Sequence, residues 1–206
     1  MNKKFIYGIS IMSMMFTITS CGGGEEESTE EIPVETIEVE TEVVEPVAYT
    51  VDTANSVINW NNFDEGEPGH TGTVKVLEGS YTAEGDLITD AALTIDMNSL
   101  TCDSDKLLAH LGNEEFFDIN KYASAAFNFD RHEEGMIYGT LNAGGLEFAV
   151  EAPVTVGDGT VEIGEFKIDM SQLPYFVTEK TDAPEDEWHD TNIGFSAMIV
   201  GNTSAE

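Results

Sequence analysis

The chain has 206 residues, of which 40 are Asp or Glu and 8 are Lys or Arg, so its formal net charge is −32. Such a charge disfavours nucleic acid as a partner, because phosphates repel it and no segment gathers the cations needed for counterion release. Hydrophobic residues still make up 41% of the chain. This content is enough for one globular core, so we expect one domain with a tail.

Residues 1–20 have the features of a lipoprotein signal peptide. A basic start precedes the apolar run 5–18, which is too short to span a bilayer as a helix. The run ends in the sequence ITSC at 18–21, which resembles a bacterial lipobox. There, small residues adjoin the cleavage point and the Cys21 thiol takes a diacylglyceryl group. Cleavage without lipidation is the alternative. If Cys21 is lipidated, Cys102 is alone and no intramolecular disulfide forms.

Residues 21–47 read as the lipidated cysteine and an acidic, disordered tether. Between Gly22 and Val47 the chain has ten Glu, three Gly, two Pro and no Lys or Arg. Like charges keep such a segment extended, although the alternation of Val or Ile with Glu leaves a strand as the alternative. The Glu run after three glycines also resembles the export signal of Bacteroidetes-type lipoproteins. We therefore expect a cell-envelope protein, lipid-anchored to the outer membrane on its periplasmic or cell-surface face.

Residues 48–206 read as one β domain. Apolar and polar residues alternate with period two, the pattern of half-buried strands, and Gly-containing turn signals separate the runs. The pattern predicts eight strands, at 56–60, 71–81, 86–97, 123–131, 136–142, 146–156, 161–170 and 192–200.

One segment, 105–111, has a helical pattern, with Ser104 as a capping residue and Gly112 as a stop. Eight strands with hairpin connections and one short helix in the middle predict an all-β fold, an eight-stranded antiparallel barrel. Closure is favoured because it removes the exposed edges of an open sheet. A β-sandwich is the alternative.

Four blocks of the sequence resemble the YceI-like family. They are VDT at 51–53 with SVINW at 56–60, HTGTV at 70–74, TIDMNSL at 94–100, and HLGNEEFFDINKYASAAFNF at 110–129. The resemblance covers residues 49–200. It implies a lipocalin-like barrel with a long apolar cavity that binds an isoprenoid or another amphiphilic lipid.

The sequence departs from the family pattern at Ser124, where proline is usual, and over residues 139–146. The loop at 179–190 is acidic where many relatives carry basic elements. The change at Ser124 matters little for function, whereas the other departures weaken the expectation of a phosphorylated head group. The shortage of Lys and Arg after residue 47 favours a neutral or weakly polar head group, such as a quinone ring or an alcohol.

Alternation along the strands assigns the inward faces. An eight-stranded barrel is just wide enough to be filled by its own side chains or to hold one slender ligand. A filled barrel, serving as a structural or adhesive surface module, is therefore the alternative function. The residues predicted to line a lipid cavity are Ile58, Trp60, Val74, Val76, Leu93, Ile95, Met97, Phe127, Phe129, Ile137, Leu141, Phe148, Phe166, Ile168 and Phe195.

His70 and His110 are the candidates for contact with a lipid head group, with a structural role as the alternative for each. No metal site is predicted, because His110 and Glu114 have i, i+4 spacing but lack a third ligand. No nucleophile elbow, P-loop or dinucleotide fingerprint occurs. Acidic neighbours, Asp103 among them, disfavour a reactive Cys102 thiolate. We expect a binding protein rather than an enzyme, with no cofactor other than a bound polyprenyl-type lipid or quinone, and with a monomer or a homodimer left open.

Overall fold

The computed structural model describes residues 44–64 and 67–203. The predicted signal peptide, Cys21 and all of the tether before Val44 lie outside these residues. Neither α-helix of the described part has the length or the apolar character needed to cross a bilayer.

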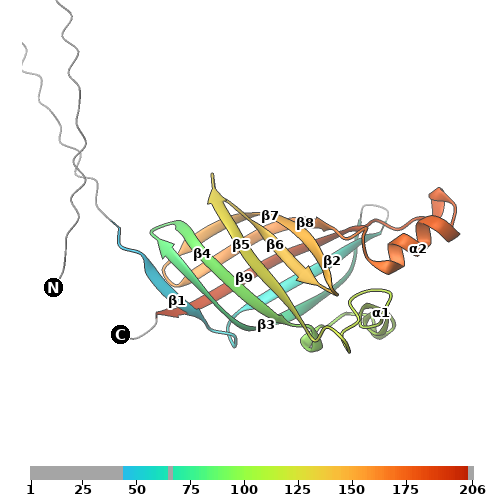
Figure 1. The fold of residues 1–206 in the computed structure, drawn as a ribbon, viewed down its shortest axis with the longest axis horizontal. Helices are drawn as coiled ribbons and strands as arrows, with labels where there is room; N and C mark the ends of the chain where they lie inside the picture. Colours follow the sequence, from blue (N-terminus) through green and yellow to red (C-terminus); the bar gives the residue numbers. More distant parts are fainter. Residues whose placement is uncertain (1–43, 65–66, 204–206) are drawn as a thin grey trace, which may run out of the picture. The chain divides into compact units, whose positions relative to one another are not determined.

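Nine strands form one antiparallel sheet that closes on itself (Figure 1). β3 and β4 pair along most of their lengths, and this pairing joins the two ends of the sheet into a barrel. The predicted eight-stranded antiparallel barrel is therefore confirmed, with all eight predicted strands present. The strands are β1 (Val47–Val51), β2 (Val57–Asp64), β3 (Glu67–Glu84), β4 (Leu87–Asp96), β5 (Ser124–Glu133), β6 (Met136–Ala143), β7 (Leu146–Gly157), β8 (Thr160–Asp169) and β9 (Asn192–Thr203).

The ninth strand, β1, was not predicted from the sequence, and it does not add a position to the barrel. Both β1 and β2 pair with β3 on one side and with β9 on the other. The two short strands therefore share one position in the barrel, interrupted by the turn between Val51 and Val57. Five residues carry little local signal, and it is pairing with two distant strands that makes this segment a strand.

β-bulges change which residues face inward along a single strand. In β3 the register shifts between Val76 and Glu78, so that Leu77 is the extra residue and is 55% exposed. Before this bulge Val74 and Val76 are buried, and after it the buried residues are Tyr81 and Ala83. Similar shifts occur in β5 and β8. In these three strands, a strict period of two therefore predicts the inward-facing residues only as far as the bulge.

Two helices lie at the end of the barrel opposite the start of β1 and the end of β9 (Figure 1). α1 (Asp105–Leu111) is the predicted helix, and the Ser104 hydroxyl caps it by accepting a hydrogen bond from the Leu107 N–H at 3.3 Å. α2 (Pro174–Asp182) was missed, since its apolar residues crowd the first turn instead of recurring every three or four positions. The short 3₁₀ turn η1 (Met97–Ser99) precedes α1, and a second one, η2 (Glu185–Glu187), follows α2.

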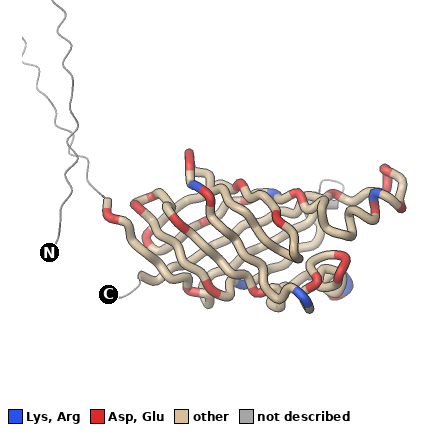
Figure 2. The backbone as a smooth tube through the Cα atoms, in the orientation of Figure 1, with Lys and Arg blue, Asp and Glu red and all other residues tan. Residues whose placement is uncertain are grey.

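Among the residues whose side chains the structure describes, no Asp, Glu, Lys or Arg is buried, and Figure 2 shows where these residues occur along the barrel and the helices. Among the described residues, the only polar side chain classed with the buried core is Ser56, whose hydroxyl accepts a hydrogen bond from the Val200 N–H at 2.9 Å. The interior is therefore apolar despite the large negative charge of the chain.

Candidate functional site

The interior of the barrel is hollow, with a cavity of about 580 Å³. This volume lies within the range of small-molecule sites in proteins, roughly 300 to 1,000 Å³. Of the fifteen residues predicted to line a cavity, twelve do so: Ile58, Trp60, Val74, Leu93, Ile95, Met97, Phe127, Ile137, Leu141, Phe166, Ile168 and Phe195.

The remaining three predicted residues, Val76, Phe129 and Phe148, are not part of the cavity wall. Val76 and Phe148 are buried in the packed core, with exposed fractions of 3% and 2%. Phe129 packs against that core and is the last paired residue before the bulge of β5. Alternation tells which face of a strand a side chain occupies, but neighbouring side chains decide whether space remains in front of it.

Stacked aromatic rings lie at the end of the cavity away from the helices. The rings of Tyr49 on β1 and Tyr81 on β3 are 4.7 Å apart between centroids and nearly parallel. Tyr81 lines the cavity, and its hydroxyl is buried with no hydrogen-bond partner among the described residues. Burial, with smaller contributions from Tyr49 and Asp158, raises the pKa of Tyr81 to about 12. Tyr81 is therefore an uncharged lining residue at neutral pH.

The helices line the opposite end of the cavity with apolar side chains. Leu107 and Leu111 come from α1, and Tyr175 and Phe176 come from α2. Phe116, which follows α1, stacks on Tyr175 with ring centroids 4.8 Å apart. This contact joins the segments after α1 to α2 across the end of the barrel.

His70 lines the cavity at the helical end, where β3 begins. Its Nδ1 atom lies 2.7 Å from Asp103 Oδ1, in the segment between η1 and α1. This hydrogen bond, opposed by burial, holds the pKa of Asp103 below its ordinary value. Because the bond occupies Nδ1, the other ring nitrogen of His70 remains available to a ligand.

His110 is not among the residues that line the cavity, and its contact with a lipid head group stays a prediction. It is exposed on α1. Leu107 and Leu111, four residues apart, share the side of α1 that lines the cavity.

His189, in the segment between α2 and β9, lines the cavity, although the sequence did not mark it as a candidate. Its Nδ1 contacts Glu179 Oε1 on α2, and its backbone N–H donates to Glu179 Oε2 at 3.0 Å. Burial raises the pKa of Glu179, but the hydrogen bonds from His189 outweigh it, so the net shift is downward. The acidic loop around His189 reads as solvated in the sequence, and no local pattern marks this histidine as a cavity residue.

The chemistry of the wall follows from these positions. None of the described residues that line the cavity is Lys or Arg, while the acid Asp190 does line it. Polar groups able to hydrogen-bond a ligand include His70, Tyr175 and His189, all close to the helices. The arrangement can surround an apolar chain and offer hydrogen bonds to an uncharged group.

Cys102 lies beside this region but is not arranged as a nucleophile. Its thiol donates to Asp103 Oδ1 at 3.6 Å, so the carboxylate, and not the imidazole of His70, is its hydrogen-bond partner. Burial and the Asp103 carboxylate raise the pKa of the Cys102 thiol. An activated cysteine needs a neighbouring base or cation that lowers its pKa.

A closed antiparallel barrel with one apolar cavity defines a lipocalin-like architecture. Within that class, the chain belongs to the family of YceI-like domains, which it matches over residues 49–187. No protein among the curated sequences compared with the chain matches it.

Solved structures share this fold at low sequence identity. A polyisoprenoid-binding domain from Saccharophagus degradans, implicated in plant cell wall breakdown, is 13% identical, with a TM-score of 0.52 over 77% of this chain and 99% of that one. BcnA from Burkholderia cenocepacia is 16% identical, with a TM-score of 0.51 over 74% of this chain and 99% of its own. At such identities these similarities concern the fold alone.

Proposed function

We propose that this protein binds an amphiphilic lipid, of polyisoprenoid or quinone type, without a covalent bond. The apolar chain of the lipid occupies the barrel cavity, and its head group lies near the helices. The observation that carries the proposal is the cavity of about 580 Å³ with its apolar wall. Membership of the YceI-like family and the fold shared with a polyisoprenoid-binding domain support it.

The affinity comes from burial of the apolar chain, at about 25 cal/mol for each Å² removed from water. The loss of conformational freedom of a flexible lipid offsets part of this gain. The head group adds hydrogen bonds with His70, His189 or Tyr175, which fix its position. Binding of this kind needs no reaction, so we assign the protein a carrier or storage role and not a catalytic one.

The test is identification of the native ligand. Full-length protein is purified from membranes, weighed by native mass spectrometry, and extracted with organic solvent for lipid analysis. We expect one lipid per chain, with a polyprenyl or similarly long and slender apolar tail. A protein that carries no lipid, and that does not take one up after extraction, contradicts the proposal.

Trp60 provides a second measurement because it lines the cavity, whereas Trp188 does not. A quinone bound in the cavity quenches the fluorescence of a nearby indole. We expect an isoprenoid quinone to quench the extracted protein in proportion to occupancy, and the Trp60→Phe variant to lose most of that response. Equal quenching in the variant places the quinone outside the barrel.

We further propose that the protein is anchored in the cell envelope through acylated Cys21. Two acyl chains hold a protein stably on a bilayer even when its charge is unfavourable. We expect the Cys21→Ser variant to move from the membrane fraction to the soluble fraction. A variant that still sediments with membranes after a high-salt wash contradicts lipidation at this residue.

A further inference from the structure

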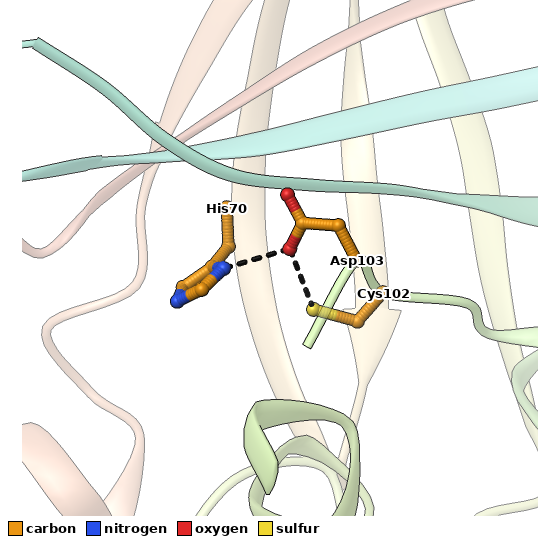
Figure 3. A group of neighbouring side chains, drawn as sticks. All are labelled: His70, Cys102 and Asp103. Carbon is orange, nitrogen blue, oxygen red and sulfur yellow. Dashed lines mark hydrogen bonds and ion pairs between the residues drawn. The ribbon is translucent and has the colours of Figure 1, made fainter. Parts of the chain in front are cut away.

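Three side chains at the helical end of the barrel bring nitrogen, sulfur and oxygen donors together: His70, Cys102 and Asp103 (Figure 3). Their potential ligand atoms all lie within 4.8 Å of one another. His70 belongs to β3, and the other two residues to the segment that joins η1 to α1. Asp103 Oδ1 lies between the other two donors, 2.7 Å from His70 Nδ1 and 3.6 Å from Cys102 Sγ.

The backbone holds this group in place. The Asp103 N–H donates to the Thr71 carbonyl at 3.0 Å, and the Thr71 N–H donates back to Asp103 Oδ2 at 3.2 Å. The second bond occupies one carboxylate oxygen and directs the other toward His70 and Cys102. The Ser104 N–H donates to Cys102 Sγ at 3.4 Å, a contact that stabilises a thiolate. Each donor from the segment before α1 thus has a partner that orients it.

The close approach of this segment to β3 depends on Gly72. A β-carbon at this position would lie 1.9 Å from the Thr101 carbonyl oxygen and 2.6 Å from the indole nitrogen of Trp60. That indole donates to the same carbonyl at 3.1 Å. The residue before Cys102 is therefore held against the barrel wall by a contact that only glycine permits.

The separation between the oxygen and sulfur donors fits a tetrahedral ion. Bonds of about 2.0 to 2.3 Å to nitrogen, oxygen and sulfur place the ligands of Zn²⁺ about 3.3 to 3.8 Å apart. The separation between Asp103 Oδ1 and Cys102 Sγ already meets this value. The imidazole of His70 has to move away from Asp103 Oδ1 for an ion to lie between them, and its 49% exposed side chain leaves room for that movement. The hydrogen bond between His70 and Asp103 joins two atoms that an ion would bridge.

We propose that His70 Nδ1, Cys102 Sγ and Asp103 Oδ1 form a three-ligand site for a late first-row divalent ion, with Zn²⁺ as the best match. A thiolate with an imidazole selects Zn²⁺ or its neighbours over Mg²⁺ and Ca²⁺, which prefer oxygen alone. The thiolate and the carboxylate together neutralise the charge of the ion. Three protein ligands leave a fourth position for water, as in sites that exchange ligands. His70 also lines the cavity, so the ion sits beside the proposed head-group position.

The experiment measures metal binding by the full chain, with Cys21→Ser present in every protein so that Cys102 is the only thiol. Zn²⁺ is titrated calorimetrically in excess Mg²⁺, which occupies sites made of carboxylates alone. Co²⁺ is then added as a spectroscopic probe, because a thiolate ligand produces a charge-transfer band in the near ultraviolet. We expect one ion per chain and that band.

Replacement of a ligand separates this site from adventitious binding. We expect Cys102→Ser to abolish the Co²⁺ charge-transfer band, and both Cys102→Ser and His70→Gln to weaken Zn²⁺ binding by at least tenfold. His110→Gln, which removes an exposed histidine of α1 outside the group, is the matched control and keeps both signals. Circular dichroism establishes that each variant is folded.

Zn²⁺ binding that is equal in all of these proteins, or absent from the parent chain, overturns the proposal. The result is independent of lipid binding, because the measurement uses the metal ions alone. A chain that binds lipid without metal, or metal without lipid, therefore shows which of the two proposals has failed.

Discussion

Leu93 is the residue at which the cavity can be tested most directly. It lies on β4 opposite Gly79 of β3 and Phe127 of β5, is partly buried, and lines the cavity. We predict that Leu93→Trp lowers lipid affinity by at least tenfold at little cost in stability, because the added ring occupies space that lipid fills. The measurement is lipid retention by native mass spectrometry together with thermal unfolding. Leu77→Trp, at an exposed position of β3, is the control.

The opposite outcome has a clear physical meaning. In a barrel already filled by side chains, the larger residue overpacks the core and costs about 1 to 3 kcal/mol. Loss of stability in Leu93→Trp with no change in bound lipid would therefore favour the structural role over the carrier role.

A second prediction concerns the hydroxyl group of Tyr81. Its hydroxyl is buried without a hydrogen-bond partner among the described residues, and such a group costs about 1 to 3 kcal/mol. Tyr81→Phe removes the hydroxyl and keeps the stacking on Tyr49. We predict an unchanged or higher melting temperature, measured by calorimetry without ligand. A clear decrease shows that the hydroxyl is hydrogen-bonded in solution.

Glu179 and His189 join α2 to the loop that follows it. Glu179 on α2 contacts the imidazole of His189 and accepts a hydrogen bond from its backbone, while its side chain is only 10% exposed. Because the folded-state pKa of Glu179 lies below the ordinary 4.5, the pair contributes stability in full above about pH 4.5. That contribution is lost as the pH falls through the folded-state pKa and the carboxylate takes up a proton.

We therefore predict that Glu179→Gln lowers stability at neutral pH, by an amount of the order of 1 kcal/mol. The difference from the wild type shrinks as the pH falls below 4.5, and it disappears below the folded-state pKa of Glu179, where the wild-type carboxylate is also neutral. Thermal unfolding from pH 7 to pH 3 measures it. Glu185→Gln removes an exposed charge from the same loop as a control. A difference that persists unchanged into acid shows that packing, and not charge, holds α2.

At the scale of the whole molecule, the net charge of −32 bears on the choice of ligand. A diphosphate head group has to approach a strongly negative protein, and no Lys or Arg lies among the described residues of the cavity wall. Salt screens this repulsion, with a Debye length of about 8 Å at physiological ionic strength. An uncharged head group meets no such barrier.

We predict that a polyprenyl alcohol binds the extracted protein more tightly than the matching diphosphate, and that added salt improves the binding of the diphosphate alone. Titrations of both lipids at low and high salt measure this, with a chelator present so that no bound ion attracts the phosphates. Tighter binding of the diphosphate, weakened by salt, reveals a cationic pocket and contradicts the prediction.

The barrel architecture of this protein could be predicted from its sequence. Period-two alternation and Gly turns located all eight predicted strands, and closure followed because an open sheet of these strands leaves unpaired edges. The local signals of α1, Ser104 and Gly112, were sufficient for that helix. Twelve cavity residues followed from alternation, since a strand presents every second side chain to the same face.

Features that depend on contacts between distant segments could not be predicted from local sequence patterns. β1 exists because β3 and β9 pair with it, and His189 reaches the cavity because Glu179 on α2 holds it there. The distinction between Phe127, which lines the cavity, and Phe148, which is packed in the core, depends on neighbours from other strands. His70 and the Cys102–Asp103 pair lie some 30 positions apart in the sequence, and only the folding of their segment against β3 brings three potential metal ligands together. A local pattern records the preferences of one segment, whereas packing and pairing are properties of segments that meet only in the folded chain.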